Sequence, residues 1–403
     1  MKYVVILGDG MADYPQEKIG GKTPLMVANT PNIDGLCPYS EIGLFKSVPD
    51  GMKPGSDVAN LSVLGYNPEN CYTGRSPLEA ASIGIDLKNT DVTARANLVT
   101  LSNEEKFEDK TMIDYSAGEI TTEEAKELIA YLKENLDTEK YSLYAGVSYR
   151  HCLVVDNGVI AGDLTPPHDF TGKPVKDKLP KSKEGQFYLE LMKKSVELLK
   201  DHPVNLKRIK EGKNPANSLW FWGEGTKPEL ETYKQRFGIS AGMISAVDLL
   251  KGIGKLSGMR VIEVEGATGN YDTNFTGKKD ACLNALDSGL DFVYIHMEAP
   301  DECGHHGDLE KKIYSIEQID QKVVGPIIKA LNEKGEPFKI LICPDHPTPI
   351  KTMTHSSDPI PYLIYDSRKK EVGNNKTYNE ETAKNSGIFE PVGYKLMYKF
   401  LEK

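Results

Sequence analysis

The sequence predicts an α/β protein in which helices sandwich a parallel β-sheet and a smaller α+β domain interrupts the larger one. Short apolar runs rich in β-branched residues at 3–7, 291–297 and 338–343 are typical of buried parallel strands, and each stops at a loop. Residues 308–331 lie between the last two runs and are charged and amphipathic, which predicts a long helix. Because strand, helix and strand follow one another as in a βαβ crossover, we expect a parallel sheet with helices on both faces.

A second helix and strand, predicted over residues 242–250 and 259–264, repeat this order. The glycine-rich run at 252–258 lies between them and is the only one that invites comparison with a phosphate-binding loop. It follows a helix and precedes a strand, which is the reverse of the order that nucleotide-binding fingerprints require. We therefore interpret it as a helix C-cap and turn, and the sequence argues against a nucleotide-binding kinase or dehydrogenase.

The middle of the chain has a different pattern. Residues 95–101 and 149–155 alternate like half-exposed strands, and a helix with a capping signature is predicted to begin after Thr121. Residues 166–174 are rich in proline and turn formers, which is typical of an extended linker. These features predict a separate α+β domain inserted into the α/β domain.

The length of 403 residues suggests two or three domains. We predict that residues 89–182 form the inserted domain, and that residues 1–88 and 183–403 together form the larger, discontinuous one. The net charge of −10 argues against nucleic acid or an anionic membrane as the main partner. No apolar stretch approaches the roughly 20 residues that span a bilayer, and the six cysteines form no Cys-x-x-Cys pair. We therefore expect a cytoplasmic protein with reduced thiols, and its oligomeric state is not predicted.

Acids and histidines follow three of the predicted strands. Asp9 follows the first strand, Asp301 follows the run at 291–297, and Asp345-His346 follows the run at 338–343. Because ligands of an open parallel sheet collect beyond the carboxyl ends of its strands, we expect these side chains to converge. His305 lies four residues after Asp301, so a helix beginning there would place both on one face.

This set of side chains, together with His355, predicts a metal site. Carboxylates mixed with imidazoles suit Mn²⁺, Zn²⁺, Mg²⁺ or Co²⁺, and the histidine content favours Mn²⁺ or Zn²⁺ over Mg²⁺. The number of ligands is sufficient for two ions. Pairs of ions are the usual means of stabilising the attacking and leaving oxygens in phosphoryl transfer.

Ser56 follows a Pro-Gly turn and precedes a helical apolar pattern. It is therefore predicted at a helix N-terminus, where backbone N–H groups and the helix dipole favour an oxyanion or a phosphate. A plain N-cap is the alternative interpretation of such a serine. A metal bound to its hydroxyl would lower the pKa of that hydroxyl and make it a nucleophile.

Seven motifs keep a recognisable order along the whole chain, namely Gly8-Asp9-Gly10 and residues 54–66, 72–79, 146–151, 220–225, 298–305 and 343–346. In these motifs the chain resembles the archaeal-type cofactor-independent (2,3-bisphosphoglycerate-independent) phosphoglycerate mutases of the alkaline phosphatase superfamily. The resemblance implies an alkaline-phosphatase-like metal domain interrupted by a smaller domain that closes over the substrate.

The resemblance also implies a reaction. Ser56 would take the phosphoryl group from a phosphoglycerate and return it to the neighbouring hydroxyl through a phosphoserine intermediate, as in glycolysis and gluconeogenesis, with neither a nucleotide nor bisphosphoglycerate as cofactor. Arg75, Arg150 and His151 match family motifs of polar residues near the small phosphorylated substrate. The resemblance implies one metal ion held by Asp9, Ser56, Asp345 and His346, and a second held by Asp301, His305 and His355.

Alternative functions share much of this machinery. A homoserine kinase-like phosphotransferase of the same family would need the same serine and metals. A metal-dependent phosphatase or phosphonate hydrolase would use water in place of the second hydroxyl, which a domain that excludes water argues against. A binding module without catalysis would leave the convergent ligands unexplained.

Overall fold

The computed structural model describes residues 1–370 and 375–402, and the contacts within it divide the chain into two compact units. Met1–Tyr72 and the described residues from Glu229 onward form the larger unit, and Thr73–Pro228 form the smaller one. The smaller unit extends beyond the predicted limits of 89 and 182 at both ends. The reason is that α5 (Ser76–Ser82) and β7 (Ser218–Thr226) pack against β3 (Val92–Leu101), which lies at the centre of that unit.

The larger unit contains an eight-stranded sheet whose order is β13-β2-β12-β11-β1-β10-β8-β9. The strands β11, β1, β10, β8 and β9 are parallel to one another, whereas β12 is antiparallel to both of its neighbours. The bounds are β1 Lys2–Gly8, β2 Ser40–Phe45, β8 Ala241–Ile244, β9 Arg260–Val261, β10 Phe292–Met297, β11 Phe338–Cys343, β12 Ile360–Asp366 and β13 Phe389–Glu390.

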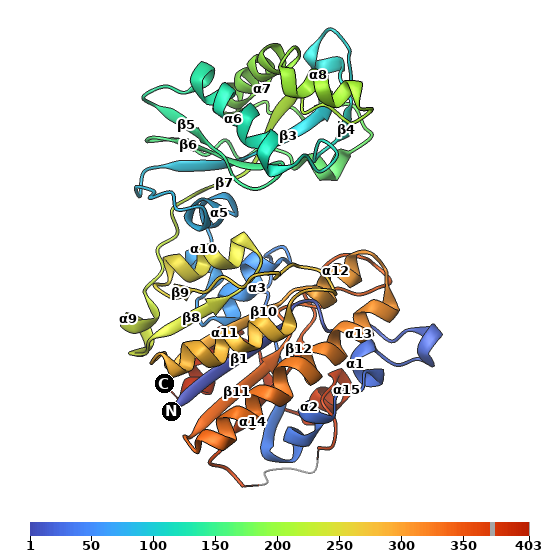
Figure 1. Cartoon of the computed structure of the whole chain (residues 1–403), viewed down its shortest axis with the longest axis vertical. Coiled ribbons are helices and arrows are strands. Elements are labelled where there is room, and N and C mark those ends of the chain that lie inside the picture. Colours follow the sequence, from blue (N-terminus) through green and yellow to red (C-terminus); the bar gives the residue numbers. More distant parts are fainter. Residues whose placement is uncertain (371–374, 403) are drawn as a thin grey trace. The chain divides into compact units, whose positions relative to one another are not determined.

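Helices cover both faces of this sheet. They are α1 Pro24–Val27, α2 Pro31–Leu36, α3 Ser56–Val63, α4 Pro68–Cys71, α9 Tyr233–Phe237, α10 Asp248–Leu256, α11 Phe275–Asp287, α12 Ala299–His305, α13 Leu309–Ile319, α14 Gly325–Lys334, α15 Glu380–Asn385 and α16 Lys395–Leu401. The predicted long helix at 308–331 is α13 and α14, joined by a π-helical turn at Asp320–Val324. Figure 1 shows α11 and α14 lying across one face of the sheet.

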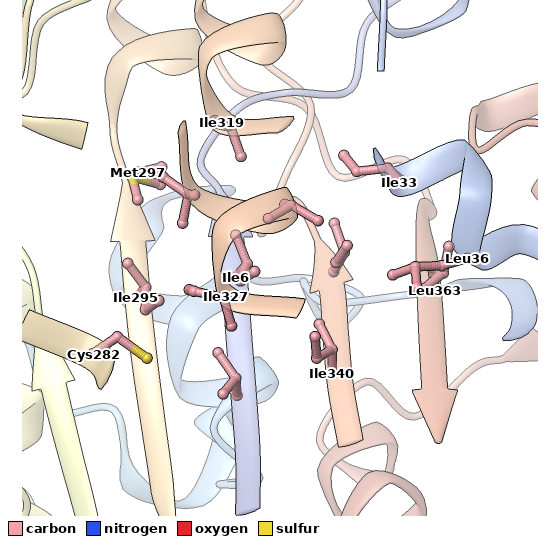
Figure 2. Close-up of a cluster of buried hydrophobic side chains, with 14 of the residues drawn as sticks. Ile6, Ile33, Leu36, Cys282, Ile295, Met297, Ile319, Ile327, Ile340 and Leu363 are labelled. Atoms are coloured by element: carbon pink, nitrogen blue, oxygen red, sulfur yellow. The ribbon is translucent and has the colours of Figure 1, made fainter. Parts of the chain in front are cut away.

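The core on that face consists of side chains that alternate along the strands. Figure 2 shows Ile6, Ile295 and Ile340 on the neighbouring strands β1, β10 and β11, with Ile327 of α14 packed on them, and all four are buried. Residues of odd and even number point to opposite faces of a strand. Tyr3 therefore points to the opposite face of the sheet, where its ring contacts that of Phe400 in α16.

The smaller unit contains a five-stranded antiparallel sheet in which β3 pairs with β4, β6 and β7, and β5 pairs with β6. Its other elements are β4 Met112–Asp114, β5 Tyr141–Tyr144, β6 Arg150–Val155, α6 Thr122–Leu136, α7 Gly185–Leu199 and α8 Pro203–Lys210. Thr121 caps α6 by accepting a hydrogen bond from the backbone N–H of Glu124, as predicted. The observed α/β unit with a mixed, largely parallel sheet and the interrupting α+β unit confirm the predicted fold class.

Four local predictions were wrong. Residues 242–250 are not one helix, because β8 ends at Ile244 and α10 begins only at Asp248. The strand predicted over 259–264 is reduced to Arg260–Val261. Residues 95–101 are buried throughout, since β3 has strands on both sides and helices against its faces. Residues 166–174 are not a linker, because Phe170 is buried against Trp220 in the core of the smaller unit.

The two ends of the smaller unit are joined by a hydrogen bond, in which the Thr73 hydroxyl donates to the carbonyl oxygen of Thr226 at 2.6 Å. In the larger unit the Tyr66 hydroxyl donates to the carbonyl oxygen of Glu231 at 2.5 Å, near the points where the chain leaves and returns. Among the described helices none combines the length and the apolar character that a membrane crossing demands.

Candidate active site

The candidate site lies beyond the carboxyl ends of three adjacent strands, β11, β1 and β10. The register pairs Leu7 with Cys343 on one side and Gly8 with Met297 on the other, so these strands end at the same level. The residues that follow the strands are therefore brought together, as the positions of Asp9, Asp301 and Asp345 in the sequence predict. Asp301 and His305 both lie on α12, the helix expected after β10.

The turn after β1 depends on Gly10. Its φ of +61° is in the left-handed region, and a β-carbon at this position would lie 2.7 Å from the Cα of Asp301. Its N–H donates a hydrogen bond to Oδ1 of Asp345 at 3.2 Å. A side chain at position 10 would therefore push apart the strand ends that carry the acids.

Ser56 is the first residue of α3, and Gly55 rather than Ser56 is the N-cap. The serine side chain is therefore not used as a plain cap. Its Oγ lies 3.2 Å from Nε2 of His346. The hydroxyl stands at the start of a helix and beside the acid–histidine cluster, which is where a phosphoryl-accepting oxygen is expected.

The first group of candidate metal ligands consists of Asp9, Asp345 and His346, whose ligand atoms all lie within 4.8 Å of one another and are all buried. Nε2 of His346 lies 3.4 Å from Oδ2 of Asp345 and 3.6 Å from Oδ1 of Asp9. Oδ1 of Asp9 is buried and has no hydrogen-bond partner among the described residues. Burial, followed by the charge of Asp345, holds the pKa of Asp9 well above its usual range. A divalent cation would relieve both the unpaired oxygen and the repulsion, so these residues fit a metal.

The second group consists of Asp301, His346 and His355. Oδ1 of Asp301 lies 3.5 Å from Nε2 of His355, and its Oδ2 lies 3.3 Å from Nε2 of His305. The imidazole of His346 packs against that of His355, with ring centroids 4.0 Å apart. His346 thus lies between the two groups, whereas the resemblance assigns it to one of them alone.

Three neighbours of these groups were missed from the sequence. Asn60 donates a hydrogen bond to Oδ2 of Asp345 at 2.7 Å, and its position four residues after Ser56 on one helix was the available signal. The hydroxyl of Thr348 bonds Oδ1 of Asp301 and lies 3.2 Å from Nδ1 of His346. Nε2 of His296, in β10, lies 2.9 Å from Oδ2 of Asp9.

Arg75, Arg150 and His151, the predicted substrate-binding residues, all belong to the smaller unit. Nε of Arg75 lies 2.9 Å from Glu79, and the guanidinium of Arg150 lies 4.8 Å from the ring centroid of Tyr149. Nδ1 of His151 accepts a hydrogen bond from the N–H of Gly146 at 3.1 Å. Burial, with a smaller contribution from the charge of Arg150, lowers the pKa of His151 to about 3, so this imidazole is neutral at pH 7.

Comparisons with known proteins agree with the motifs. The family model described as 2,3-bisphosphoglycerate-independent phosphoglycerate mutase matches residues 38–205. The chain is 49% identical to the 2,3-bisphosphoglycerate-independent phosphoglycerate mutase of Methanosarcina barkeri over 96% of both chains. It is 46% identical to the probable enzyme of that name from Geobacter sulfurreducens over the full length of both.

Solved structures are similar over the same extent. A protein of Pyrococcus horikoshii shares 30% of its residues, with a TM-score of 0.82 over all of this chain and 97% of that one. The cofactor-independent phosphoglycerate mutase of Thermoplasma acidophilum shares 25%, with a TM-score of 0.66 over all of this chain and 99% of that one. The chain therefore belongs to the 2,3-bisphosphoglycerate-independent phosphoglycerate mutase family.

Proposed function

We propose that the protein interconverts 3-phosphoglycerate and 2-phosphoglycerate in a metal-dependent reaction that needs no bisphosphoglycerate. The observation that carries this proposal is the position of the Ser56 hydroxyl, at the start of α3 and 3.2 Å from Nε2 of His346. The relatives named above support the choice of phosphoglycerate as the substrate. In the cell the reaction would serve glycolysis and gluconeogenesis in the cytoplasm.

We assign two divalent ions to the cluster. The ligand chemistry of carboxylate oxygens and imidazole nitrogens favours Mn²⁺ or Zn²⁺, and Mg²⁺ and Co²⁺ are compatible with part of it. When bound, such ions would lower the pKa of the serine hydroxyl and balance negative charge on the phosphoryl oxygens. The proposed ligands are Asp9, Ser56, Asp345 and His346 for one ion, and Asp301, His305 and His355 for the other.

The reaction proceeds in two transfers. Oγ of Ser56 gives up its proton and forms a bond to phosphorus, while the bond from phosphorus to the glycerate oxygen breaks and that oxygen takes up a proton, which gives phosphoserine and glycerate. The neighbouring hydroxyl of glycerate then gives up its proton and attacks the same phosphorus, while the bond to Oγ breaks and Oγ takes up a proton. Backbone N–H groups at the start of α3 stabilise the phosphoryl oxygens at both stages.

We assign substrate binding in the smaller unit to Arg75, Arg150 and His151. The fork of an arginine binds a carboxylate or a phosphate with two hydrogen bonds. Nδ1 of His151 is occupied by the N–H of Gly146, so Nε2 carries the proton of the neutral ring and is available as a donor. These groups match the two anionic ends of a phosphoglycerate.

The test is an enolase-coupled assay on chelator-treated protein before and after reloading with Mn²⁺, in the absence of bisphosphoglycerate. We expect turnover of 3-phosphoglycerate only in the reloaded protein, and none for Ser56→Ala. The absence of turnover in the reloaded protein would exclude the proposal. ATP-dependent phosphorylation of homoserine in its place would indicate the kinase-like branch of the family, and steady release of inorganic phosphate would indicate a phosphatase.

A further inference from the structure

His296 occupies an unusual position between two carboxylates. It lies near the end of β10, where it pairs with Leu7 of β1 and is fully buried. Its Nε2 lies 2.9 Å from Oδ2 of Asp9, a close contact that lacks hydrogen-bond geometry, and its Nδ1 lies 3.0 Å from Oε1 of Glu298. An imidazole with each nitrogen facing an acid links those two acids through one rigid ring.

The outer acid of this row is firmly held. The N–H of Ala246 donates to Oε1 of Glu298 at 2.8 Å, and the Ser245 hydroxyl donates to the same oxygen at 3.1 Å. The other oxygen of Glu298 pairs with the ammonium of Lys278, which also donates to the carbonyl oxygen of His296 at 2.8 Å. Burial would raise the pKa of Glu298, but Lys278 and His296 outweigh burial and hold it well below its usual range. Glu298 is therefore a carboxylate that fixes the imidazole.

The inner acid is a proposed metal ligand, and only one of its oxygens faces the imidazole. Oδ2 of Asp9 faces His296, whereas Oδ1 lies 3.6 Å from Nε2 of His346 and has no hydrogen-bond partner among the described residues. The imidazole thus limits the movement of the Asp9 carboxylate on one side by close contact, and the other side is open.

We propose that His296 is a positioning residue for metal binding, which holds the Asp9 carboxylate so that Oδ1 is presented to the ion shared with Asp345 and His346. This inference rests on the proposed metal site. Glu298 and Ser245 contact the imidazole of His296, and Lys278 contacts its carbonyl oxygen, so these side chains act through His296. Partners outside the ligand shell that fix a ligand's orientation typically change metal affinity by about 10–100-fold when they are removed.

The charges around Asp9 explain why an imidazole is needed between Glu298 and Asp9. Asp9 is buried beside Asp345, so repulsion between the two carboxylates favours turning them away from one another. An imidazole on the far side of Asp9 opposes that movement before any ion arrives. If His296 only stabilised the fold, replacing it would weaken the binding of both ions equally or of neither. A positioning role predicts that the binding of one ion alone is weakened.

The experiment measures binding of Mn²⁺ to the metal-free full-length protein by isothermal titration calorimetry. We expect wild type to bind two ions. In His296→Asn, whose amide reaches only toward Glu298, one ion should bind about 10–100-fold more weakly and the other unchanged. In His296→Gln, whose longer amide reaches the place of Nε2 and can donate to Asp9, most of the lost affinity should return.

Ile295→Val is the matched control, since it alters the neighbouring buried residue of the same strand and touches neither acid. It should bind both ions as wild type does. If His296→Asn does not fold, Ser245→Ala removes a hydroxyl that lies 3.1 Å from both Nδ1 of His296 and Oε1 of Glu298, and it should weaken the same single ion. If whichever of His296→Asn and Ser245→Ala folds binds both ions as tightly as wild type does, His296 is not a positioning residue.

Failure of the proposed function gives a different result. If wild type bound no Mn²⁺, the metal site itself would be refuted. If wild type bound two ions but did not convert phosphoglycerate, the proposed substrate would be wrong, while a selective loss of one ion in His296→Asn would still support the positioning role.

Discussion

Nε2 of His305 lies 2.9 Å from Nε2 of His355, and Asp301 lies within 3.5 Å of both imidazoles. Two imidazole nitrogens at that separation, with a carboxylate beside both, are placed to share one metal cation. This arrangement makes the second ion of the proposed pair separately testable.

Replacement of His355 by alanine should reduce the bound metal from two ions to one. It removes a nitrogen from the group that Asp301 completes, and it leaves Asp9 and Asp345 untouched. Turnover of phosphoglycerate should fall further than it does when a residue that only contacts a metal ligand is removed, a change that typically costs about 10–100-fold. Inductively coupled plasma mass spectrometry after dialysis gives the stoichiometry. His306→Ala, at a histidine outside both groups, should keep two ions, and two ions in His355→Ala would contradict the assignment.

Asn60→Leu should destabilise the larger unit more than Tyr294→Phe. Asn60 donates to Oδ2 of Asp345 at 2.7 Å and accepts from the Tyr294 hydroxyl at 2.5 Å, so leucine removes a buried hydrogen-bond partner from both groups. We expect a loss of about 3–5 kcal/mol in the free energy of unfolding for Asn60→Leu, and about 1 kcal/mol for Tyr294→Phe. Thermal unfolding of the metal-free proteins followed by circular dichroism measures both, and equal losses would mean that Asn60 does not hold Asp345.

The smaller unit should lose stability as the pH falls through the range in which a free histidine titrates. The pKa of His151 is lowered to about 3 by burial and by Arg150, so in the unfolded chain this residue takes up a proton near pH 6.5 that the folded chain refuses. Stability from this group is complete above pH 6.5 and is lost between pH 6.5 and about 3, by at most about 1.4 kcal/mol per pH unit.

His151→Asn isolates that contribution, because asparagine can still accept the hydrogen bond from Gly146 and does not titrate. Both tryptophans of the chain, Trp220 and Trp222, lie in the smaller unit, so urea unfolding followed by tryptophan fluorescence reports on this unit. The variant should show a shallower loss of stability between pH 6.5 and 5 than wild type. Parallel pH profiles would mean that His151 is protonated in the folded state.

Lys312→Met should cost about 3–5 kcal/mol of unfolding free energy, because it leaves the buried carboxylate of Asp13 without its cation. The ammonium of Lys312 lies 2.8 Å from Oδ2 of Asp13 and donates to the carbonyl oxygen of Thr348 at 2.8 Å. The double variant Asp13→Asn/Lys312→Met should recover part of the loss, since the remaining amide is neutral. A double variant no more stable than Lys312→Met in chemical denaturation would exclude the charge as the cause.

The positions of Asp9, Asp301 and Asp345 could be predicted because parallel strands end at a common edge, so residues that follow them meet whatever the details of packing. His296 could not be predicted in the same way. It lies inside a strand, where a histidine is only one polar residue in an apolar run, and its role depends on Asp9 and Glu298, which the fold brings to its two ring nitrogens. Tertiary partners of this kind leave no periodic signal in the sequence.

The misassigned segments have similar causes. The run from 241 to 250 is apolar enough for either element, and a four-residue strand followed by a helix has the same hydropathy as one helix. The smaller unit reaches beyond residues 89–182 because β7 pairs with β3 across more than 100 residues of sequence, and only the fold brings them together. The family, in contrast, could be identified from short sequence motifs without knowledge of the fold.

The hydrogen bond between Thr73 and Thr226 has a consequence for how such a protein can evolve. A segment whose two ends are already held together by a hydrogen bond can be excised, duplicated or exchanged as one unit, while the host chain needs only a short bridge in its place. A gene of this architecture can therefore exchange the whole smaller unit in one recombination event. Grafting the corresponding segment of a homologue between residues 72 and 229 would test whether the smaller unit can be exchanged in this way.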